Sequence, residues 1–236
     1  TIAAALAHGG IDERAFRRVG ELAPLAAPAL LGGAGLVVDE RRDAGDGAQG
    51  VEVVFDADGR LWVGTRSNGL NRCSVTPFAC ERFDGRDPGT PSLGHHHVTA
   101  LRTDGNGSLW IATSGGGLRR AQFGEGGRVL GFDRWSTDEG LLSDGVMSVE
   151  ADSDGSLWVA TRQGLSRLDP ASRRVVNHVP QSGLPVSHFN TGASAAHARY
   201  LYFGSVAGLV SVPKGLPLRL RPPSPVRITG VERLVD

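Results

Sequence analysis

Three adjacent histidines, His95, His96 and His97, are the most conspicuous candidates for metal binding in this chain of 236 residues. Imidazole is the commonest metal ligand near neutral pH. Adjacent side chains on an extended segment point to opposite faces, so at most two of the three could bind one ion without help from other residues. We therefore expect a solvated loop here, and we predict no metal or other cofactor.

Aspartates recur in short, glycine-terminated tetrads such as Asp56-Ala-Asp58-Gly59 and Asp152-Ser-Asp154-Gly155. These tetrads superficially resemble the start of a calcium-binding loop. Such a loop also needs a bidentate glutamate further along the chain and a helical frame, whereas a Leu-Trp-Val segment follows here almost at once. Aspartate side chains commonly accept hydrogen bonds from the backbone two residues further on. We therefore predict that these aspartates cap turns.

The two cysteines, Cys73 and Cys80, have six residues between them and are the only ones in the chain. We expect them in the third strand of a repeated unit and just before its fourth strand, where a hairpin would bring them face to face. In an oxidising compartment they could form a disulfide that stabilises the fold by about 2 to 3 kcal/mol. The alternative is a pair of free thiols in a reducing cytosol.

A repeated sequence motif predicts the strands and turns that position these histidines, aspartates and cysteines. The motif Asp-x-x-Gly-x-Leu-Trp occurs three times, around Trp62, Trp110 and Trp158, and successive tryptophans are 48 residues apart in both cases. A degenerate fourth copy has Tyr202 in the place of the tryptophan. A fixed period of about 20 to 50 residues indicates a repeat architecture.

Each copy of the repeat indicates four short β-strands. The aspartate-rich tetrad lies between two apolar runs, which is typical of a tight β-hairpin, and a later Gly-Leu pair marks a second turn. Four antiparallel strands per repeat form the blade of a propeller. We therefore predict an all-β fold, a β-propeller with four-stranded antiparallel blades and a period of about 48 residues. Because the chain holds fewer than five such repeats, we expect a partial ring.

The recurring tryptophan has two interpretations. One large ring per blade can fill the space between adjacent sheets, and this is the interpretation we favour. The alternative is an exposed row of aromatic rings that binds carbohydrate or bases. Composition bears on the second interpretation, because 25 basic residues balance 25 acidic ones. This balance leaves no electrostatic footprint for nucleic acid, and no apolar run is long enough to span a bilayer.

The loops that precede each blade are the predicted ligand-binding rim. Counting back from the strands that follow places His96, Asp144 and Ser187 at equivalent positions, and His188 follows directly. Equivalent loops of a propeller lie on one face, and loops on a rigid scaffold commonly carry function. The alternative is that they are linkers with ordinary turn chemistry. For a rim active site, only His96, Asp144 and His188 are candidates, and their spacing selects no reaction.

The full repeat, Asp-x-x-Gly-x-Leu-Trp-Val-Gly/Ala-Thr-x-x-Gly-Leu-x-Arg, resembles that of two-component regulator propellers over residues 51–212. These are periplasmic sensor regions of bacterial hybrid histidine kinases and of some diguanylate cyclases. The resemblance implies a non-catalytic, ligand-sensing module that regulates a cytoplasmic kinase or cyclase absent from this chain. It implies a small-molecule ligand, such as a carbohydrate, and a homodimer formed through the full-length receptor. A propeller enzyme (a lyase or hydrolase) and a protein-interaction scaffold are the alternatives.

Domain boundaries follow from the repeat and the resemblance. The segment Pro222-Pro-Ser-Pro-Val-Arg-Ile-Thr229 is similar to the entry into the immunoglobulin-like domain that usually follows such propellers. The expected organisation is a degenerate blade or lead-in over residues 1–47, blades over 48–90, 91–137, 138–182 and 183–216, and a proline-rich linker with the first strand of an immunoglobulin-like domain over 217–236.

Overall fold

The computed structural model describes residues 52–56, 58–74, 79–84 and 89–216. These residues form fifteen β-strands and two short 3-10 helices, Glu125–Gly127 and Pro180–Ser182. The prediction of an all-β fold is therefore confirmed. The predictions for residues 1–47 and 217–236 lie outside the described residues.

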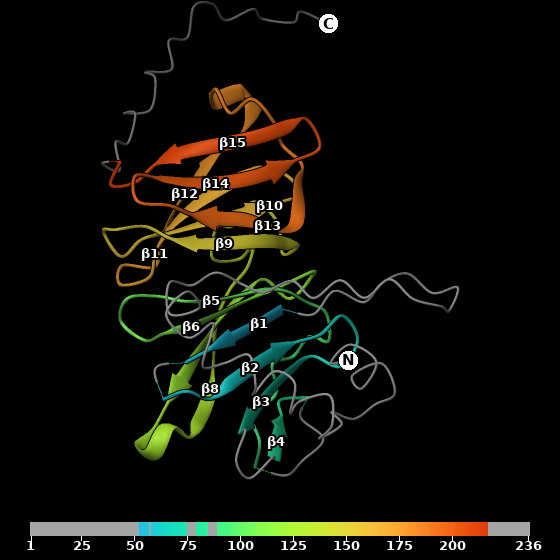
Figure 1. The fold of residues 1–236 in the computed structure, drawn as a ribbon. Helices are drawn as coiled ribbons and strands as arrows, with labels where there is room; N and C mark the ends of the chain where they lie inside the picture. The colour runs from blue at the N-terminus through green and yellow to red at the C-terminus, as the bar shows by residue number, and fades with distance from the viewer. Residues whose placement is uncertain (1–51, 57, 75–78, 85–88, 217–236) are drawn as a thin grey trace, which may run out of the picture.

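The strands form four antiparallel sheets, each a simple meander in chain order, and the sheets are arranged in a ring as propeller blades (Figure 1). The first blade consists of β1 (Glu52–Phe55), β2 (Leu61–Gly64), β3 (Leu70–Ser74) and β4 (Ala79–Arg82). The second consists of β5 (Val98–Thr103), β6 (Leu109–Thr113), β7 (Leu118–Phe123) and β8 (Val129–Trp135). The third consists of β9 (Val146–Ala151), β10 (Leu157–Thr161), β11 (Leu165–Asp169) and β12 (Arg174–His178). The fourth has three described strands, β13 (Phe189–Ala196), β14 (Tyr200–Ser205) and β15 (Gly208–Pro213).

The aspartate tetrads form the turns between the first two strands of each blade, as predicted. Oδ1 of Asp56 accepts hydrogen bonds from the backbone N–H groups of Asp58 and Arg60, at 3.0 and 2.9 Å. Asp104 makes the same two bonds in the second blade, both at 2.9 Å. Gly59 closes its turn with a φ of 75°, in the left-handed region that glycine adopts without strain. The aspartate side chain thus accepts hydrogen bonds from N–H groups of the tight turn that have no backbone acceptor there.

Three apolar clusters hold successive blades together. Trp62 packs with Leu101, Leu109 and Ile111 of the second blade, and the next two interfaces repeat this arrangement. The tryptophan side chains are buried, because Trp62, Trp110 and Trp158 are only 0%, 1% and 4% exposed. The interpretation of these rings as core residues is therefore confirmed.

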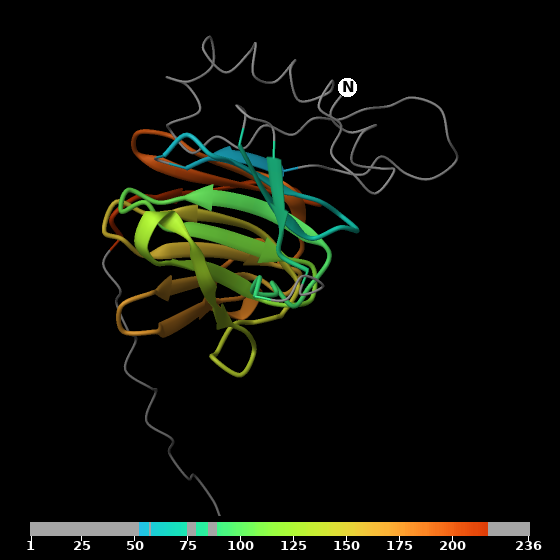
Figure 2. The same cartoon turned by 90° about the horizontal axis from the view of Figure 1, so that it is seen from below.

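A buried polar network lies where the innermost strands of all four blades meet. Arg102 of β5 donates from Nε to Oε1 of Glu150 in β9 at 3.0 Å and from Nη2 to the carbonyl of Ser194 in β13 at 3.3 Å. Its Nη1 lies 3.8 Å from Oε2 of Glu52 in β1. Figure 2 shows β1 beside the fourth blade, and a Cβ at Gly192 would lie 2.8 Å from Oε1 of Glu52. Among the described residues, this polar network takes the place of an apolar cluster between the first and fourth blades.

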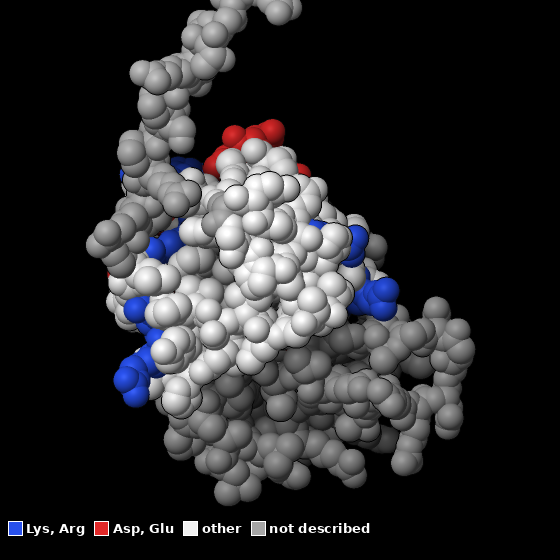
Figure 3. Space-filling model, turned by 90° about the horizontal axis from the view of Figure 1, so that it is seen from above, with Lys and Arg blue, Asp and Glu red and all other residues white. Residues whose placement is uncertain are grey.

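The outer part of the fourth blade is exposed and largely uncharged. Within the described chain, β15 pairs only with β14. Leu209 is 68% exposed and Val206, in the turn before β15, is 75% exposed. Figure 3, which looks onto the molecule from above Figure 1, shows a surface over β15 with charged side chains only near its borders.

Candidate functional site

The predicted rim lies at the opposite ends of the strands from the aspartate turns. In each antiparallel blade, the turn between the first and second strands lies at one end, and the turn between the second and third strands lies at the other. The loop that enters the next blade runs along the second of these turns. The rim is therefore made of turns and entry loops that alternate from blade to blade.

Backbone hydrogen bonds fix the entry loops against the preceding blade. The N–H of Gly69 donates to the carbonyl of His96 at 2.8 Å, and the N–H of Gly117 donates to the carbonyl of Asp144 at 2.9 Å. His96 and Asp144 therefore occupy equivalent positions on one face. A second backbone hydrogen bond occurs at equivalent positions of the second and fourth blades. The carbonyl of His97 accepts from the N–H of Ser114 at 3.1 Å, and the carbonyl of His188 accepts from the N–H of Val206 at 3.3 Å. This bond places Ser187, the residue before His188, in the position that corresponds to His96.

A hydroxyl in each blade shapes the turn against which these loops lie. The hydroxyl at the end of the second strand donates to the carbonyl of the glycine that closes the following turn, where the third strand begins. The four pairs are Thr65 and Gly69 at 3.1 Å, Thr113 and Gly117 at 2.7 Å, Thr161 and Gly164 at 3.0 Å, and Ser205 and Gly208 at 2.8 Å. The Thr-x-x-Gly part of the repeat thus builds the rim.

The histidine triplet forms a loop in which each ring has a different environment. His96 is exposed, whereas His95 and His97 are half-buried. Nδ1 of His95 accepts from the backbone N–H of His97 at 3.2 Å. Burial, with further contributions from Arg66, His95 and Arg162, lowers the pKa of His97. This side of the rim therefore presents cationic and neutral nitrogen donors. No cluster of three or more metal-binding side chains occurs among the described residues.

Asp144 is held by its own loop and by a neighbouring arginine. Its Oδ1 accepts from the backbone N–H of Thr137 at 2.7 Å, and its Oδ2 lies 3.6 Å from Nη2 of Arg134. Burial and the charge of Arg134 lower the pKa of Arg119, against the opposing effects of Asp144 and Glu139. The Nε of Arg119 is buried and makes no hydrogen bond within the described chain. Asp144 thus belongs to a group of charges that contains two arginines, Arg119 and Arg134, and a second carboxylate, Glu139.

Ser187 and His188 form a local pair, with Oγ 2.9 Å from Nδ1. General-base catalysis by a histidine normally needs a third group that orients the ring. Within the described residues, no hydrogen bond or ion pair joins His188, His96 and Asp144 to one another. The arrangement therefore offers separate donors and acceptors for binding a polar molecule, and it does not assemble the acid–base group considered from the sequence.

The cysteines lie in the outer hairpin of the first blade. Cys73 of β3 and Cys80 of β4 are directly opposite each other, and a disulfide joins them. The bond closes the two outermost strands of this blade. It lies in the sheet and not among the entry loops that form the rim.

Sequence reasoning missed a repeated side-chain unit of aspartate, tryptophan and arginine. The indole N–H of each tryptophan donates to Oδ2 of the tetrad aspartate six residues earlier, at 2.9, 2.9 and 3.1 Å in the three blades. An arginine of the third strand lies over each indole ring, with its guanidinium carbon 5.5, 5.6 and 5.4 Å from the centroid. The three units are Asp56–Trp62–Arg72, Asp104–Trp110–Arg120 and Asp152–Trp158–Arg167. Both the aspartate and the arginine recur in the sequence repeat, so the signal was present, but only turn capping was assigned to the aspartate.

The fold and these units define the chain as a β-propeller with four blades. Two segments, residues 92–115 and 140–163, match the family model described as "Two component regulator propeller". These segments are two-component regulator propeller repeats, and the predicted resemblance is confirmed. Each contains an entry loop of the rim and the first two strands of a blade. No curated protein matches the chain.

A solved structure shows the same fold. The extracellular domain of the hybrid two-component system BT3049 from B. thetaiotaomicron is similar at 24% sequence identity, with a TM-score of 0.55. The match covers 68% of this chain and 23% of that one, so the chain spans about a quarter of its length. The extracellular domain of BT4673 from the same organism has 17% identity and a TM-score of 0.38, over 72% of this chain and 30% of that one. The first similarity supports the propeller fold, and the second adds nothing to it.

Proposed function

We propose that this propeller is the ligand-sensing module of a bacterial signal-transduction receptor and has no catalytic activity of its own. Its output would be a cytoplasmic histidine kinase or diguanylate cyclase that is absent from this chain. The observation that carries the proposal is the pair of two-component regulator propeller repeats, each of which supplies an entry loop to the same face of the ring. The repeated hydrogen bonds at His96 and Asp144 support a preformed rim.

We further propose that the module lies in the periplasm. The disulfide between Cys73 and Cys80 supports this location, because disulfides persist in oxidising compartments. The structural relative from B. thetaiotaomicron is an extracellular domain, which agrees with the proposal. Among the described residues, no helix has the length and apolar character needed to cross a membrane.

The proposed ligand is a small polar molecule, for which oligosaccharides are the first class to test. His96, Asp144, Ser187 and His188 offer hydroxyl, imidazole and carboxylate groups on the rim, which suit the hydroxyl groups of a sugar. Signalling would require the ligand to favour one of two arrangements of the receptor, for example of a homodimer, by differential affinity. A ligand that bound both arrangements equally would change nothing.

Isothermal titration of the folded chain against a panel of oligosaccharides and other small polar molecules tests the proposal. We expect binding by at least one compound, and we expect His96→Ala and Asp144→Ala to weaken it. Asn106→Ala is the matched control, because Asn106 is exposed in an aspartate turn at the other end of the strands. Absence of binding across the panel by a folded protein would contradict the proposal, as would equal losses in the control.

A further inference from the structure

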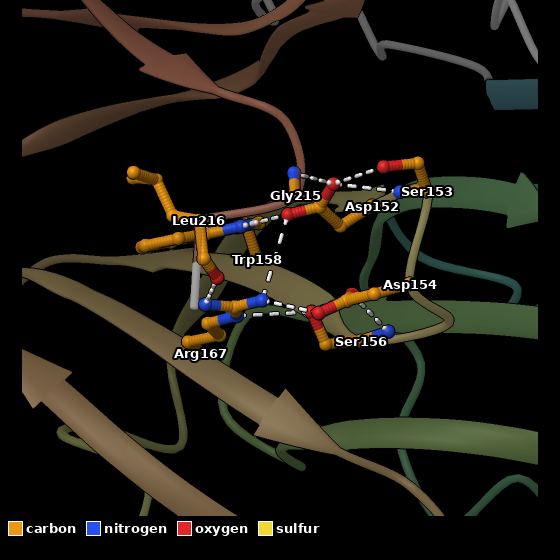
Figure 4. A network of polar contacts seen from close by, with 8 residues as sticks. All are labelled: Asp152, Ser153, Asp154, Ser156, Trp158, Arg167, Gly215 and Leu216. Carbon is orange, nitrogen blue, oxygen red and sulfur yellow. Dashed lines mark hydrogen bonds and ion pairs between the residues drawn. The ribbon is translucent and has the colours of Figure 1, made fainter. Parts of the chain in front are cut away.

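Asp152, in the aspartate turn of the third blade, accepts a hydrogen bond from a distant segment, whereas Oδ1 of Asp56 and Oδ1 of Asp104 accept from the backbone of their own turns. The backbone N–H of Gly215, just after β15, donates to Oδ1 of Asp152 at 2.8 Å, although the two residues are 63 positions apart. Nη1 of Arg167 donates to the carbonyl of Leu216. The third blade therefore binds backbone groups of two consecutive residues at the point where the chain leaves the fourth blade (Figure 4).

The side chains that bind residues 215 and 216, Asp152 and Arg167, are buried and lie close to each other. The side chains of Asp152 and Arg167 are 0% and 2% exposed, and Nη2 of Arg167 lies 3.8 Å from Oδ2 of Asp152. Arg167 also donates from Nε to Oγ of Ser156 at 3.0 Å and pairs with Asp154. Trp158 donates its indole N–H to Oδ2 of Asp152 at 3.1 Å. Hydrogen bonds to buried ionised groups are stronger than neutral ones, so this contact with residues 215–216 is strong for its size.

Comparison with the other blades shows that the bond from Gly215 is an addition to the repeat. The bond from Arg167 to the carbonyl of Leu216 has a counterpart in the first blade, where Arg72 donates to the carbonyl of Gly127. Oδ1 of Asp104 is occupied by two backbone N–H groups of its own turn. In the third blade, the residue two positions further on takes over part of this capping, because Oδ1 of Asp154 accepts from the N–H of Ser156 at 3.0 Å. Oδ1 of Asp152 is thereby available to Gly215. Residue type at this position does not explain the difference, because Asp58 stands there in the first blade, where Oδ1 of Asp56 still caps its own turn.

We propose that Asp152 and Arg167 form a latch that fixes the direction in which the chain leaves the propeller. The latch joins the third blade to the last residues of the fourth, so any change in packing between these blades alters the hold on Gly215 and Leu216. Removing one partner leaves the other buried without compensation, which favours a closed or an open latch over intermediate states. The role in signalling rests on the proposed function, because it requires that residues beyond Leu216 lead toward an output domain.

Hydrogen exchange of the Gly215 amide tests the latch directly. In Asp152→Asn, the new NH2 group faces the N–H of either Trp158 or Gly215 and cannot accept a hydrogen bond from it, so the two bonds cannot both persist. We expect exchange at Gly215 to become about tenfold faster or more. Asp104→Asn is the matched control, because it imposes the same conflict on Trp110 without any contact to residues 215–216. Arg167→Gln provides a second variant, with the same acceleration expected.

Three outcomes would overturn the latch. These are unchanged exchange at Gly215 in both latch variants while the fold is retained, equal acceleration in the Asp104→Asn control, and faster exchange that extends evenly over all four blades. A second readout is the distance between spin labels at Ser172→Cys and Leu216→Cys, two exposed positions. We expect the distance distribution to broaden in Arg167→Gln, and an unchanged distribution would also contradict the proposal. Neither measurement uses a ligand, so failure of the sensing proposal and failure of the latch are distinguishable.

Discussion

The second and third strands pair in the same register in the third and fourth blades, but the two blades differ at the face that carries the large aromatic ring. Trp158 pairs across the sheet with Arg167 in the third blade, and Tyr202 pairs with Ser211 in the fourth. The residue six positions before Tyr202 is Ala196. All three members of the aspartate–tryptophan–arginine unit are therefore replaced together in the blade whose outer face is not covered.

The difference indicates what the unit is for. A buried indole N–H needs an acceptor, which the aspartate supplies. The arginine covers the other side of the ring and pairs with a separate carboxylate, Glu81, Asp133 or Asp154, so the unit suits an indole that lies beneath another sheet. A half-exposed tyrosine needs neither, because its hydroxyl can reach water. The fourth blade still forms a regular antiparallel sheet over β13, β14 and β15. The unit thus serves the interface between blades and is not required for a blade to form.

Trp110→Ala should cause the largest loss of stability, because it truncates the aromatic ring of a face that another blade covers. Trp110 is 1% exposed and belongs to the cluster between the second and third blades. Its removal leaves a cavity between two sheets, so we expect the free energy of unfolding to fall by about 3 to 5 kcal/mol. Urea denaturation monitored by circular dichroism measures the loss. A decrease below about 1 kcal/mol would show that the interface between these blades contributes little.

The polar contact between the first and fourth blades should be sensitive to pH, unlike the three apolar interfaces. Burial raises the pKa of Glu52 from 4.5 to about 7, against the opposing charge of Arg102. Glu150 is already paired with the same guanidinium, so Glu52 is a second buried carboxylate beside one arginine. Its protonated form is therefore favoured in the folded protein.

The sign of the pH effect follows from this shift. Between pH values of about 4.5 and 7, the folded chain keeps a proton on Glu52 that the unfolded chain has lost. The contribution of Glu52 to stability therefore falls as the pH rises through this window, by as much as about 3 kcal/mol. Denaturation at pH 5 and pH 8 measures it, and Glu52→Gln should abolish this part of the dependence. An identical pH profile in Glu52→Gln would show that Glu52 ionises normally.

The repeat made much of this fold predictable, and its irregularities explain what was missed. A motif that recurs every 48 residues identifies strands, turns and the buried face without knowledge of any long-range contact. The central network was not predictable in this way. On the innermost strand, the residues opposite the three tryptophans are Val54, Arg102 and Glu150. Equivalent positions with such different chemistry give no repeated signal, and the second carboxylate of the network, Glu52, lies two residues before Val54.

The rim was predictable in position but not in chemistry. Counting along the repeat aligns His96 with Asp144, and the bonds from Gly69 and Gly117 show why the alignment holds. The partners of each side chain come from non-repeated neighbours, such as Arg134 beside Asp144. The latch was missed for a similar reason, because the contact between Asp152 and Gly215 joins one repeat to the end of another. Periodicity shows what repeats share, and these contacts depend on what they do not share.

Tyr202→Ala should have the smallest effect and completes the comparison between faces. Tyr202 is half-buried, its nearest ring is Tyr200 at 6.2 Å, and the residue opposite it, Ser211, is exposed. No aspartate or arginine depends on it, so truncation should lower the free energy of unfolding by about 1 kcal/mol or less. The same urea denaturation as for Trp110→Ala measures it. A loss as large as that of the tryptophan variant would mean that the outer face of the fourth blade is covered in solution, and the distinction between the two faces would then fail.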